Sequence, residues 1–339
     1  MPLLDKSDTP EYVPVKLIEK DRRILGALFD DARTPFSVVG KKARLSKETV
    51  AYRVKRLMDT GLLVGFNTVL DIKRMGWEVF FVYIRLRNID AAKEKEILDY
   101  LREHPNVAQL FRCIGNYDAI IKVFVRNYAE VGAVMKQVEE KFLGSIDDCS
   151  FDYIAEEIAV PFSFLYRRGK GGLLAYTGKK REMLQLSELD LKILRVLAKA
   201  ARLNFSELAA GIGSTRELVK YHVKKLEREG AILKYRPDTL PKVLGYNWYF
   251  LILKTGRLGD ELEKSLSSFL LSHPNVTYFY RTAGVNDLQV ELRVRTNEKL
   301  NEVLTQIRGI LKGTLKRFEL LTILDEPKYT YFPECLMGK

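Results

Sequence analysis

Residues 17–36 read LIEKDRRILGALFDDARTPF, and residues 186–205 read LSELDLKILRVLAKAARLNF. Nine of these twenty positions are identical at a shift of 169 residues. The same shift relates the tetrapeptide HPNV at 104–107 to its copy at 273–276. A repeat of this length is a duplicated module of several elements, because solenoid units are only about 20 to 50 residues long. The sequence therefore predicts the same fold twice in one chain.

Composition and charge narrow the class of protein. The 339 residues are 47% hydrophobic, which suffices for at least two domains with buried cores. The net charge of +12 is uneven: +5 over residues 17–70, +5 over 167–185, +4 over 186–240 and −4 over 71–166. Basic charge gathered at the start of each repeat is typical of a polyanion-binding protein. The alternative is a generally basic surface, as in heat-adapted proteins.

The start of the first repeat predicts three short helices. They cover residues 20–31, residues 36–43, and a third segment that Ser46 caps and Gly61 ends. Residues 62–66 follow as a short strand or wing. The apolar residues of the third helix have helical spacing and are Val50, Val54 and Leu57. Three helices with a tight link and a wing describe a winged helix-turn-helix.

The second repeat predicts the same plan. Ser187 with Asp190 forms a plausible capping box for its first helix, and Ser214 with Glu217 forms one for its third. Gly230 then ends the third helix. The apolar residues of this helix are Val219, Val223 and Leu226.

The third helix of each repeat presents aromatic and basic residues opposite its apolar stripe. Lysine and arginine can hold phosphates or guanine edges, and a tyrosine hydroxyl can bond to a phosphate. The alternative is a basic face that contacts only solvent. Because both copies carry aromatic and basic residues on this face, we favour DNA binding. The expected DNA-contacting residues are Ser46, Lys47, Tyr52, Arg53, Lys55 and Arg56 in the first copy, and Thr215, Arg216, Lys220, Tyr221, His222, Lys224 and Lys225 in the second.

Three segments of the first copy resemble the Lrp/AsnC family of transcription regulators. They are residues 21–25 (DRRIL), residues 32–33 (AR) and residues 45–57 (LSKETVAYRVKRL). The resemblance implies double-stranded DNA as the partner. The second copy departs from the pattern, which implies a weaker or differently specific second head; its departures are Ser214, Leu218 and His222.

The remainder of each repeat predicts a β-α-β-β-α-β order, the ferredoxin-like arrangement. The fold class is therefore α+β, with two copies of a winged helix-turn-helix followed by a ferredoxin-like domain. This second part resembles the family's effector domain, an ACT-like module that dimerises and binds amino acids between subunits. The predicted elements are 79–86, 91–104, 107–114, 118–125, 128–141 and 146–158, then 248–254, 261–273, 276–283, 287–295, 298–312 and 315–323.

A glycine-x-x-aspartate signature follows the second strand of each effector-like domain. Gly115 and Asp118 carry it in the first copy, and Gly284 and Asp287 in the second. The resemblance implies that these four residues bind an amino-acid effector. The alternative is a hairpin, because glycine supplies a positive φ and aspartate accepts from nearby backbone N–H groups.

The predicted domain boundaries follow the repeat. Residues 167–185 are glycine-rich and basic, lack phosphate-loop spacing, and predict a flexible connector. Contact of this connector with the DNA backbone is the alternative. The predicted units are an N-terminal tail (1–16), helix-turn-helix 1 (17–70), effector domain 1 (71–166), the linker (167–185), helix-turn-helix 2 (186–240) and effector domain 2 (241–339).

The sequence carries no nucleophile motif, metal-ligand spacing or dinucleotide fingerprint, so we expect no enzymatic activity, no metal and no cofactor. Siroheme decarboxylases resemble the same two-domain plan and remain an alternative. Their second strand carries a histidine-tyrosine-arginine type motif, of which Arg112 and Arg281 are present here and the histidine is absent. Three cysteines without paired spacing, and the lack of a long apolar run, predict a cytoplasmic protein without membrane attachment.

The sequence thus predicts a DNA-binding regulator in which one chain forms an intramolecular pseudo-dimer. Responses to an amino acid or related metabolite, and further homo-oligomerisation, are compatible with this interpretation. A metabolite-sensing scaffold that no longer binds DNA is the alternative from another class.

Overall fold

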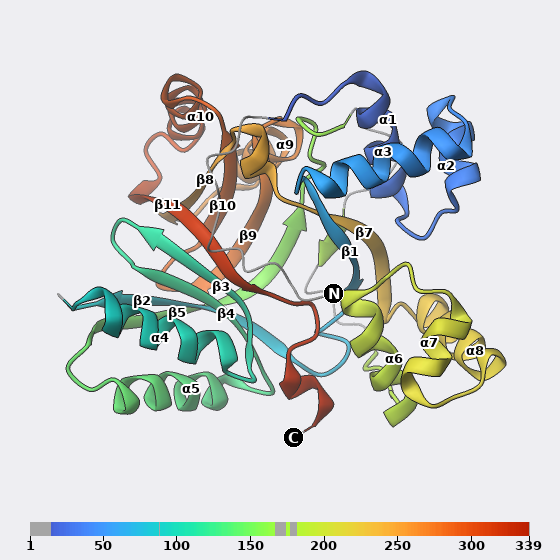
Figure 1. Cartoon of the computed structure of the whole chain (residues 1–339). Helices are drawn as coiled ribbons and strands as arrows, with labels where there is room; N and C mark the ends of the chain where they lie inside the picture. Colours follow the sequence, from blue (N-terminus) through green and yellow to red (C-terminus); the bar gives the residue numbers. More distant parts are fainter. Residues whose placement is uncertain (1–14, 88, 167–173, 177–181, 339) are drawn as a thin grey trace.

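The computed structural model describes residues 15–87, 89–166, 174–176 and 182–338. Each half of the chain begins with three helices and a strand, which we call head 1 and head 2 (Figure 1). Head 1 consists of α1 (Glu19–Asp30), α2 (Phe36–Ala43), α3 (Lys47–Asp59) and β1 (Leu63–Leu70). Head 2 consists of α6 (Glu188–Lys199), α7 (Phe205–Ile212), α8 (Arg216–Glu229) and β7 (Ile232–Thr239).

Most of the helix caps and apolar stripes predicted for the heads are present in the structure. Ser46 caps α3 by accepting from Thr49 N–H at 3.1 Å, and Ser187 with Asp190 forms a capping box on α6. The capping box predicted for Ser214 and Glu217 is wrong. Thr215 caps α8 instead by accepting from Leu218 N–H at 3.3 Å, and it is the residue equivalent to Ser46 in the first copy. The apolar stripes are buried as predicted and comprise Val50, Val54 and Leu57 on α3, and Val219, Val223 and Leu226 on α8.

The predicted wing of each head is a strand that pairs with the other head. β1 and β7 form a separate antiparallel two-stranded ribbon, with Asn67 opposite Arg236. Figure 1 shows head 1 above this ribbon and head 2 below it. The backbone hydrogen bonds of each predicted wing are therefore satisfied across the two halves of the chain, and the ribbon holds the heads together.

Two arginines at equivalent positions cross between the heads. The Arg33 guanidinium donates to the carbonyls of Ala201 (2.7 Å) and Leu203 (3.1 Å), and lies over the ring of Phe205. Arg202 donates in turn to the carbonyls of Ala32 and Thr34. These reciprocal contacts make the arrangement of the heads pseudo-symmetric and fix one head against the other.

The effector-like domains have the predicted β-α-β-β-α-β order. The first comprises β2 (Glu78–Leu86), α4 (Ala91–Glu103), β3 (Val107–Ile114), β4 (Ala119–Val125), α5 (Tyr128–Lys141) and β5 (Ile146–Ala159). After the short helix η1 (Pro241–Leu244), the second comprises β8 (Asn247–Thr255), α9 (Asp260–Ser272), β9 (Val276–Gly284), β10 (Leu288–Val294), α10 (Asn297–Ile310) and β11 (Leu315–Tyr329), and η2 (Glu334–Met337) follows.

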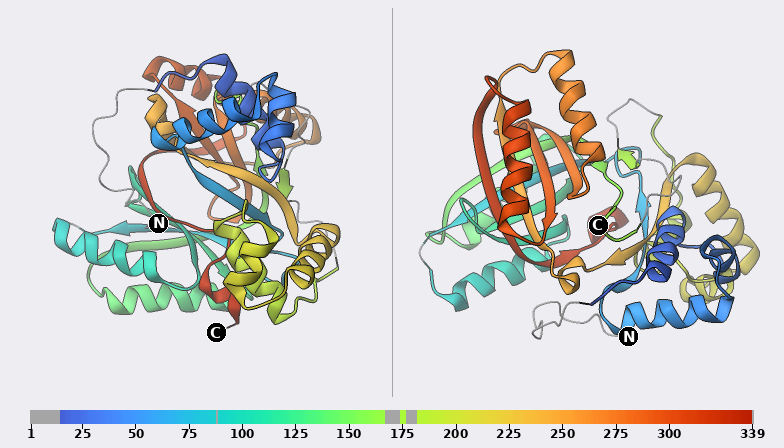
Figure 2. Two further views of the ribbon diagram at one scale, coloured as in Figure 1. Left: turned by 45° about the vertical axis from the view of Figure 1, so that its right-hand side comes forward. Right: turned by 90° about the horizontal axis from the view of Figure 1, so that it is seen from above.

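The strands of the two domains close into one barrel. The order is β2-β4-β3-β11-β8-β10-β9-β5, and β5 also pairs with β2. The halves meet at two seams, β3 with β11 and β5 with β9. Helices α4 and α5 pack outside one side of the barrel, and α9 and α10 outside the other (Figures 1 and 2). The two halves therefore pair within one chain, as predicted.

The predicted linker is only partly described. Residues 174–176 form the strand β6 (Leu174–Tyr176), which extends the sheet beyond β5. This part of the chain is thus an ordered strand rather than a flexible connector. Most of the basic linker residues, including Arg167, Arg168 and residues 179–181, lie outside the described residues.

Candidate functional site

The outward faces of α3 and α8 carry the predicted aromatic and basic groups. Tyr52 is 67% exposed and Tyr221 is 62% exposed. Both tyrosines lie on the outward faces of their helices, away from the buried apolar stripes. The other predicted contact residues exposed on these helices and their caps are Ser46, Lys47, Lys55, Arg56, Thr215, Arg216, Lys220 and Lys224.

Three predicted DNA contacts are turned into their own heads instead. Arg53 Nη1 lies 2.9 Å from Asp21 Oδ1 on α1. His222 Nδ1 lies 2.7 Å from Asp190 Oδ1, and Lys225 Nζ lies 3.2 Å from the second oxygen of Asp190. Each of the three residues precedes or follows a buried stripe residue by one or two positions, so its side chain reaches the buried carboxylate of the first helix. The assignment of these three as outward contacts is therefore corrected: they tie the third helix to the first.

The Asp190 cluster predicts a pH-dependent stability of head 2. Burial alone would raise the pKa of Asp190, but hydrogen bonds from His222, Ser187 and Lys225 outweigh it and lower the pKa. A lowered pKa contributes stability above the unfolded-state pKa of about 4 and loses it as pH falls through the folded-state value. We expect Asp190→Asn to cost about 2 kcal/mol at pH 7 and progressively less below about pH 4.

Urea denaturation followed by circular dichroism between pH 7 and pH 2.5 measures this difference. Glu188→Gln on the same helix is the control, because the Glu188 side chain is 77% exposed. A difference between wild type and Asp190→Asn that stays constant over the whole pH range would contradict the account.

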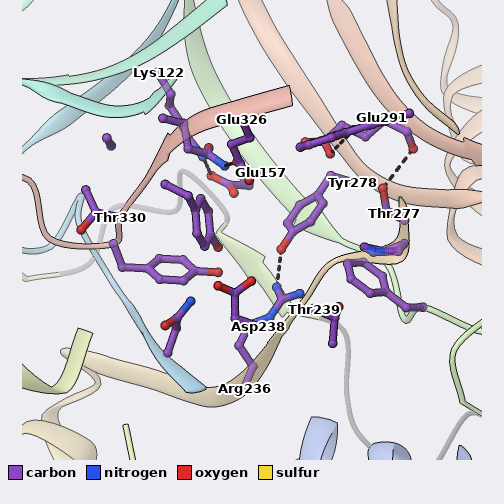
Figure 3. A pocket seen from close by; sticks show the side chains of 18 of the residues that line it. Lys122, Glu157, Arg236, Asp238, Thr239, Thr277, Tyr278, Glu291, Glu326 and Thr330 are labelled. Carbon is purple, nitrogen blue, oxygen red and sulfur yellow. Dashed lines mark hydrogen bonds and ion pairs between the residues drawn. The ribbon is translucent and has the colours of Figure 1, made fainter. Parts of the chain in front are cut away.

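A cavity of about 80 Å³ lies between one mouth of the barrel and the β1–β7 ribbon. Figure 3 shows that Lys122 and Glu157 approach it from the barrel, whereas Arg236 and Asp238 enter from the ribbon. Both halves of the chain contribute to its wall. Its aromatic lining consists of Phe124, Phe162, Trp248, Tyr278, Tyr280, Tyr329 and Tyr331.

The charged groups of this cavity are mostly held by protein partners. Lys122 Nζ lies 2.5 Å from Glu157 Oε2. Glu291 accepts from the Tyr280 hydroxyl at 2.5 Å and from Trp248 Nε1 at 3.1 Å. Burial raises the pKa of Glu291. The neighbouring Arg293 has its pKa lowered by burial to about 10 and lies 3.5 Å above the Trp248 ring. The cavity is thus a polar chamber with internally paired charges.

Arg236 connects this chamber to head 1. It donates to the Tyr278 hydroxyl of β9 and lies over the rings of Phe29 in α1 and Phe162 after β5. A group that displaced Arg236 would therefore disturb a contact among the ribbon, the barrel and head 1.

The sequence reasoning missed the chamber. Lys122 and Glu291 are equivalent positions of the two copies and carry opposite charges, and the strand around Lys122 is otherwise apolar. A single charge within the run AIIKVFV (119–125) is the signal that could have found it, because buried charges need partners. Which strand supplies that partner depends on the barrel closure, which the local sequence does not reveal.

The predicted effector residues do not line this chamber. Asp118 accepts from Leu86 N–H at 2.7 Å, and Asp287 accepts from Thr255 N–H at 2.7 Å while pairing with Lys254. Gly115 and Gly284 have φ of 145° and 151°, in the region that favours glycine. An added Cβ at Gly284 would lie 2.5 Å from Asp152 Oδ1. The two glycines thus lie against the other half at the seams, the two aspartates bond to strands of their own half, and effector contact by these four residues stays a prediction.

Within the described ranges, no three His, Cys, Asp or Glu side chains are grouped so that they could hold a metal ion. None of the described helices combines the length and the apolar character that a membrane-spanning segment requires.

Comparison with known proteins identifies the family. The family described as AsnC-type helix-turn-helix domain matches residues 19–58, Winged helix-turn-helix DNA-binding matches 186–232, and Lrp/AsnC ligand binding domain matches 79–141. The HTH-type transcriptional regulator Ptr1 of Methanocaldococcus jannaschii is 32% identical over 117 residues, which span 34% of this chain and 78% of that protein. The chain belongs to the Lrp/AsnC family. The Regulatory protein AsnC of Haemophilus influenzae is 28% identical over 116 residues, covering 34% of this chain and 76% of the relative.

A solved structure matches this Lrp/AsnC chain over nearly its full length. The siroheme decarboxylase NirDL, solved with an iron-uroporphyrin III analogue, superposes with a TM-score of 0.64 at 14% identity. The match covers 94% of this chain and 96% of that chain. The likeness concerns the fold. It corrects the expectation that the chain has no enzymatic activity, because an enzyme has the fold of nearly the entire chain.

Proposed function

We propose that this chain is a transcription regulator that binds double-stranded DNA sequence-specifically through both heads. The observation that carries the proposal is the exposed tyrosine with flanking basic residues on α3 and again on α8. Phosphate contacts from such lysines and arginines supply affinity, and side chains that reach the base edges of the major groove supply specificity. In this arrangement one chain presents the two DNA-binding heads that a regulator dimer would present with two chains.

The packing of the heads supports a fixed spacing on DNA. Arg33 and Arg202 cross between the heads, and the β1–β7 ribbon joins them. Two helix-turn-helix units presented in this way read half-sites about 34–36 Å apart or a multiple of that distance. Because the two faces differ, the preferred operator is an imperfect palindrome. The main differences are Thr49 against Leu218 and Ala51 against Lys220.

Selection of bound fragments from random and genomic DNA, followed by footprinting, tests this function. We expect enrichment of an asymmetric two-half-site sequence. The same selection with a panel of amino acids tests the proposed small-metabolite effector. A preferred site with perfect symmetry would contradict the proposed difference in sequence preference between the heads. No enrichment at all would favour the alternative of a scaffold that does not bind DNA.

The full-length likeness to NirDL favours a second candidate, binding and decarboxylation of a tetrapyrrole. The chamber at the barrel mouth offers only about 80 Å³, and no histidine lines it. A macrocycle with many carboxylates would also meet Glu157, Asp238 and Glu326 there. Tetrapyrrole binding therefore requires the chamber to open. Absorbance titration with iron-uroporphyrin III tests it, since a saturable spectral shift would support this candidate and an unchanged spectrum would reject it.

A further inference from the structure

Head 1 carries a basic cluster that has no counterpart in head 2. Lys41, Lys42 and Arg44 are exposed at the end of α2 and in the turn to α3. Among the described residues, no carboxylate pairs with Lys41 or Arg44, and Lys42 approaches Asp30 only at 4.0 Å. The equivalent positions of head 2 hold Ala210, Gly211 and Gly213, which carry no charge.

Arg44 occupies a backbone conformation that an arginine rarely adopts. Its φ and ψ are 57° and 52°, and it is the only non-glycine residue with positive φ in the described part of the chain. Gly213 adopts nearly the same conformation at the equivalent position, with φ 66° and ψ 45°. Glycine fits this C-cap without a steric penalty, whereas a side chain adds one. The strain of Arg44 therefore points to a role of its side chain that folding does not require.

The turn places these three residues beside the DNA-facing end of α3. Gly40 permits this close approach, because an added Cβ there would lie 2.6 Å from the Leu45 carbonyl oxygen. Lys47, Lys55 and Arg56 continue the positive surface along α3 without ion pairs in the described structure. Figure 1 shows α2 and α3 side by side at one corner of the molecule.

The basic residues of head 2 are more often neutralised. On α8, Arg216 lies 3.5 Å from Glu217, and Lys224 lies 2.7 Å from Glu227. Lys225 is held by Asp190. We propose that Lys41, Lys42 and Arg44 are a further DNA-backbone site, so that head 1 supplies most of the electrostatic affinity for DNA. This inference rests on the DNA-binding function proposed above.

The salt dependence of binding to a 40-base-pair duplex of random sequence tests the site. Each lost phosphate contact lowers the slope of log affinity against log salt by about 0.9, which amounts to roughly a fivefold loss between 1 M and 0.15 M salt. We expect the triple variant Lys41→Ala, Lys42→Ala, Arg44→Gly to lose about 2.7 units of slope and roughly a hundredfold in affinity at 0.15 M salt. The control variant removes three exposed charges from the outer helices and their ends: Lys136→Ala, Lys264→Ala and Lys312→Ala.

Arg44→Gly alone separates DNA contact from folding. We expect it to weaken binding roughly fivefold without lowering Tm, because glycine relieves the backbone strain. A matched pair tests the difference between the heads: Lys55→Ala is expected to lower the slope by about 0.9, and Lys224→Ala, at the equivalent position, by less than half of that.

The outcomes distinguish the two levels of the proposal. Wild-type protein that binds no DNA overturns the proposed function. Wild-type binding with equal slopes for the triple variant and its control overturns this inference alone, as does an Arg44→Gly variant whose Tm falls together with its affinity. Equal effects of Lys55→Ala and Lys224→Ala overturn the assignment of electrostatic affinity to head 1.

Discussion

Replacing Asp152 by alanine is expected to lower the free energy of unfolding by about 3 kcal/mol or more. The side chain is fully buried at the β5–β9 seam. Its two oxygens accept from Asn286 N–H (3.0 Å), Asn286 Nδ2 (2.8 Å) and the Tyr83 hydroxyl (2.8 Å). Gln289 donates to the same hydroxyl. Removing the carboxylate leaves buried donors without an acceptor, and each such donor costs about 1–3 kcal/mol.

Chemical denaturation at pH 7 measures this loss. Asp147→Ala is the matched control, because the Asp147 side chain is 47% exposed and pairs only at the surface with Arg85. We expect the control to cost less than about 1 kcal/mol. A similar small loss for both variants would show that the buried network does not hold the halves together.

The network also distinguishes the two seams of the barrel. The positions equivalent to Asp152, Tyr83 and Gln289 hold Leu321, Ile252 and Ile120, all of them fully buried. At these three positions one seam is therefore polar and the other apolar, although both seams are antiparallel. Only a first half paired with a second half satisfies both seams, so the pairing of unlike halves is chemically specified.

The second large effect concerns DNA binding by the outward faces. Replacing Tyr52, Lys55 and Arg56 by alanine is expected to weaken binding to the selected operator roughly a hundredfold at 0.15 M salt. These side chains are exposed and make no contact that the head needs for folding, so Tm should stay unchanged. Equilibrium binding by fluorescence anisotropy, with a thermal melt of the same preparation, measures both quantities.

The equivalent variant of head 2 is the comparison. Replacing Lys220, Tyr221 and Lys224 by alanine should weaken binding less but relax the base preference at one half-site. Unchanged affinity in both variants would defeat the assignment of these faces to DNA.

Sequence reasoning predicted the elements and most of the buried stripes, because hydrophobic spacing and capping residues are local signals. Val50, Val54 and Leu57 are buried as their spacing predicts. It failed where a partner lies far away in the chain. β1 was expected to be a wing of its own head, and only the folded chain reveals its pairing with β7.

In the candidate site, too, local features were predicted and long-range contacts were not. The exposure of Tyr52 and Tyr221 follows from helical periodicity. The inward turn of Arg53 and His222 does not, because it depends on Asp21 and Asp190, each 32 residues away. The polar chamber was missed for a related reason, since it forms only when strands of both halves close the barrel.

The mass of the protein–operator complex tests the central claim most directly. Sedimentation equilibrium with limiting operator, combined with a footprint of the same sample, gives the number of chains on a duplex that carries both half-sites. We predict one chain of 39.1 kDa per duplex with both half-sites protected. Protection of both half-sites only when two chains are bound would contradict the account.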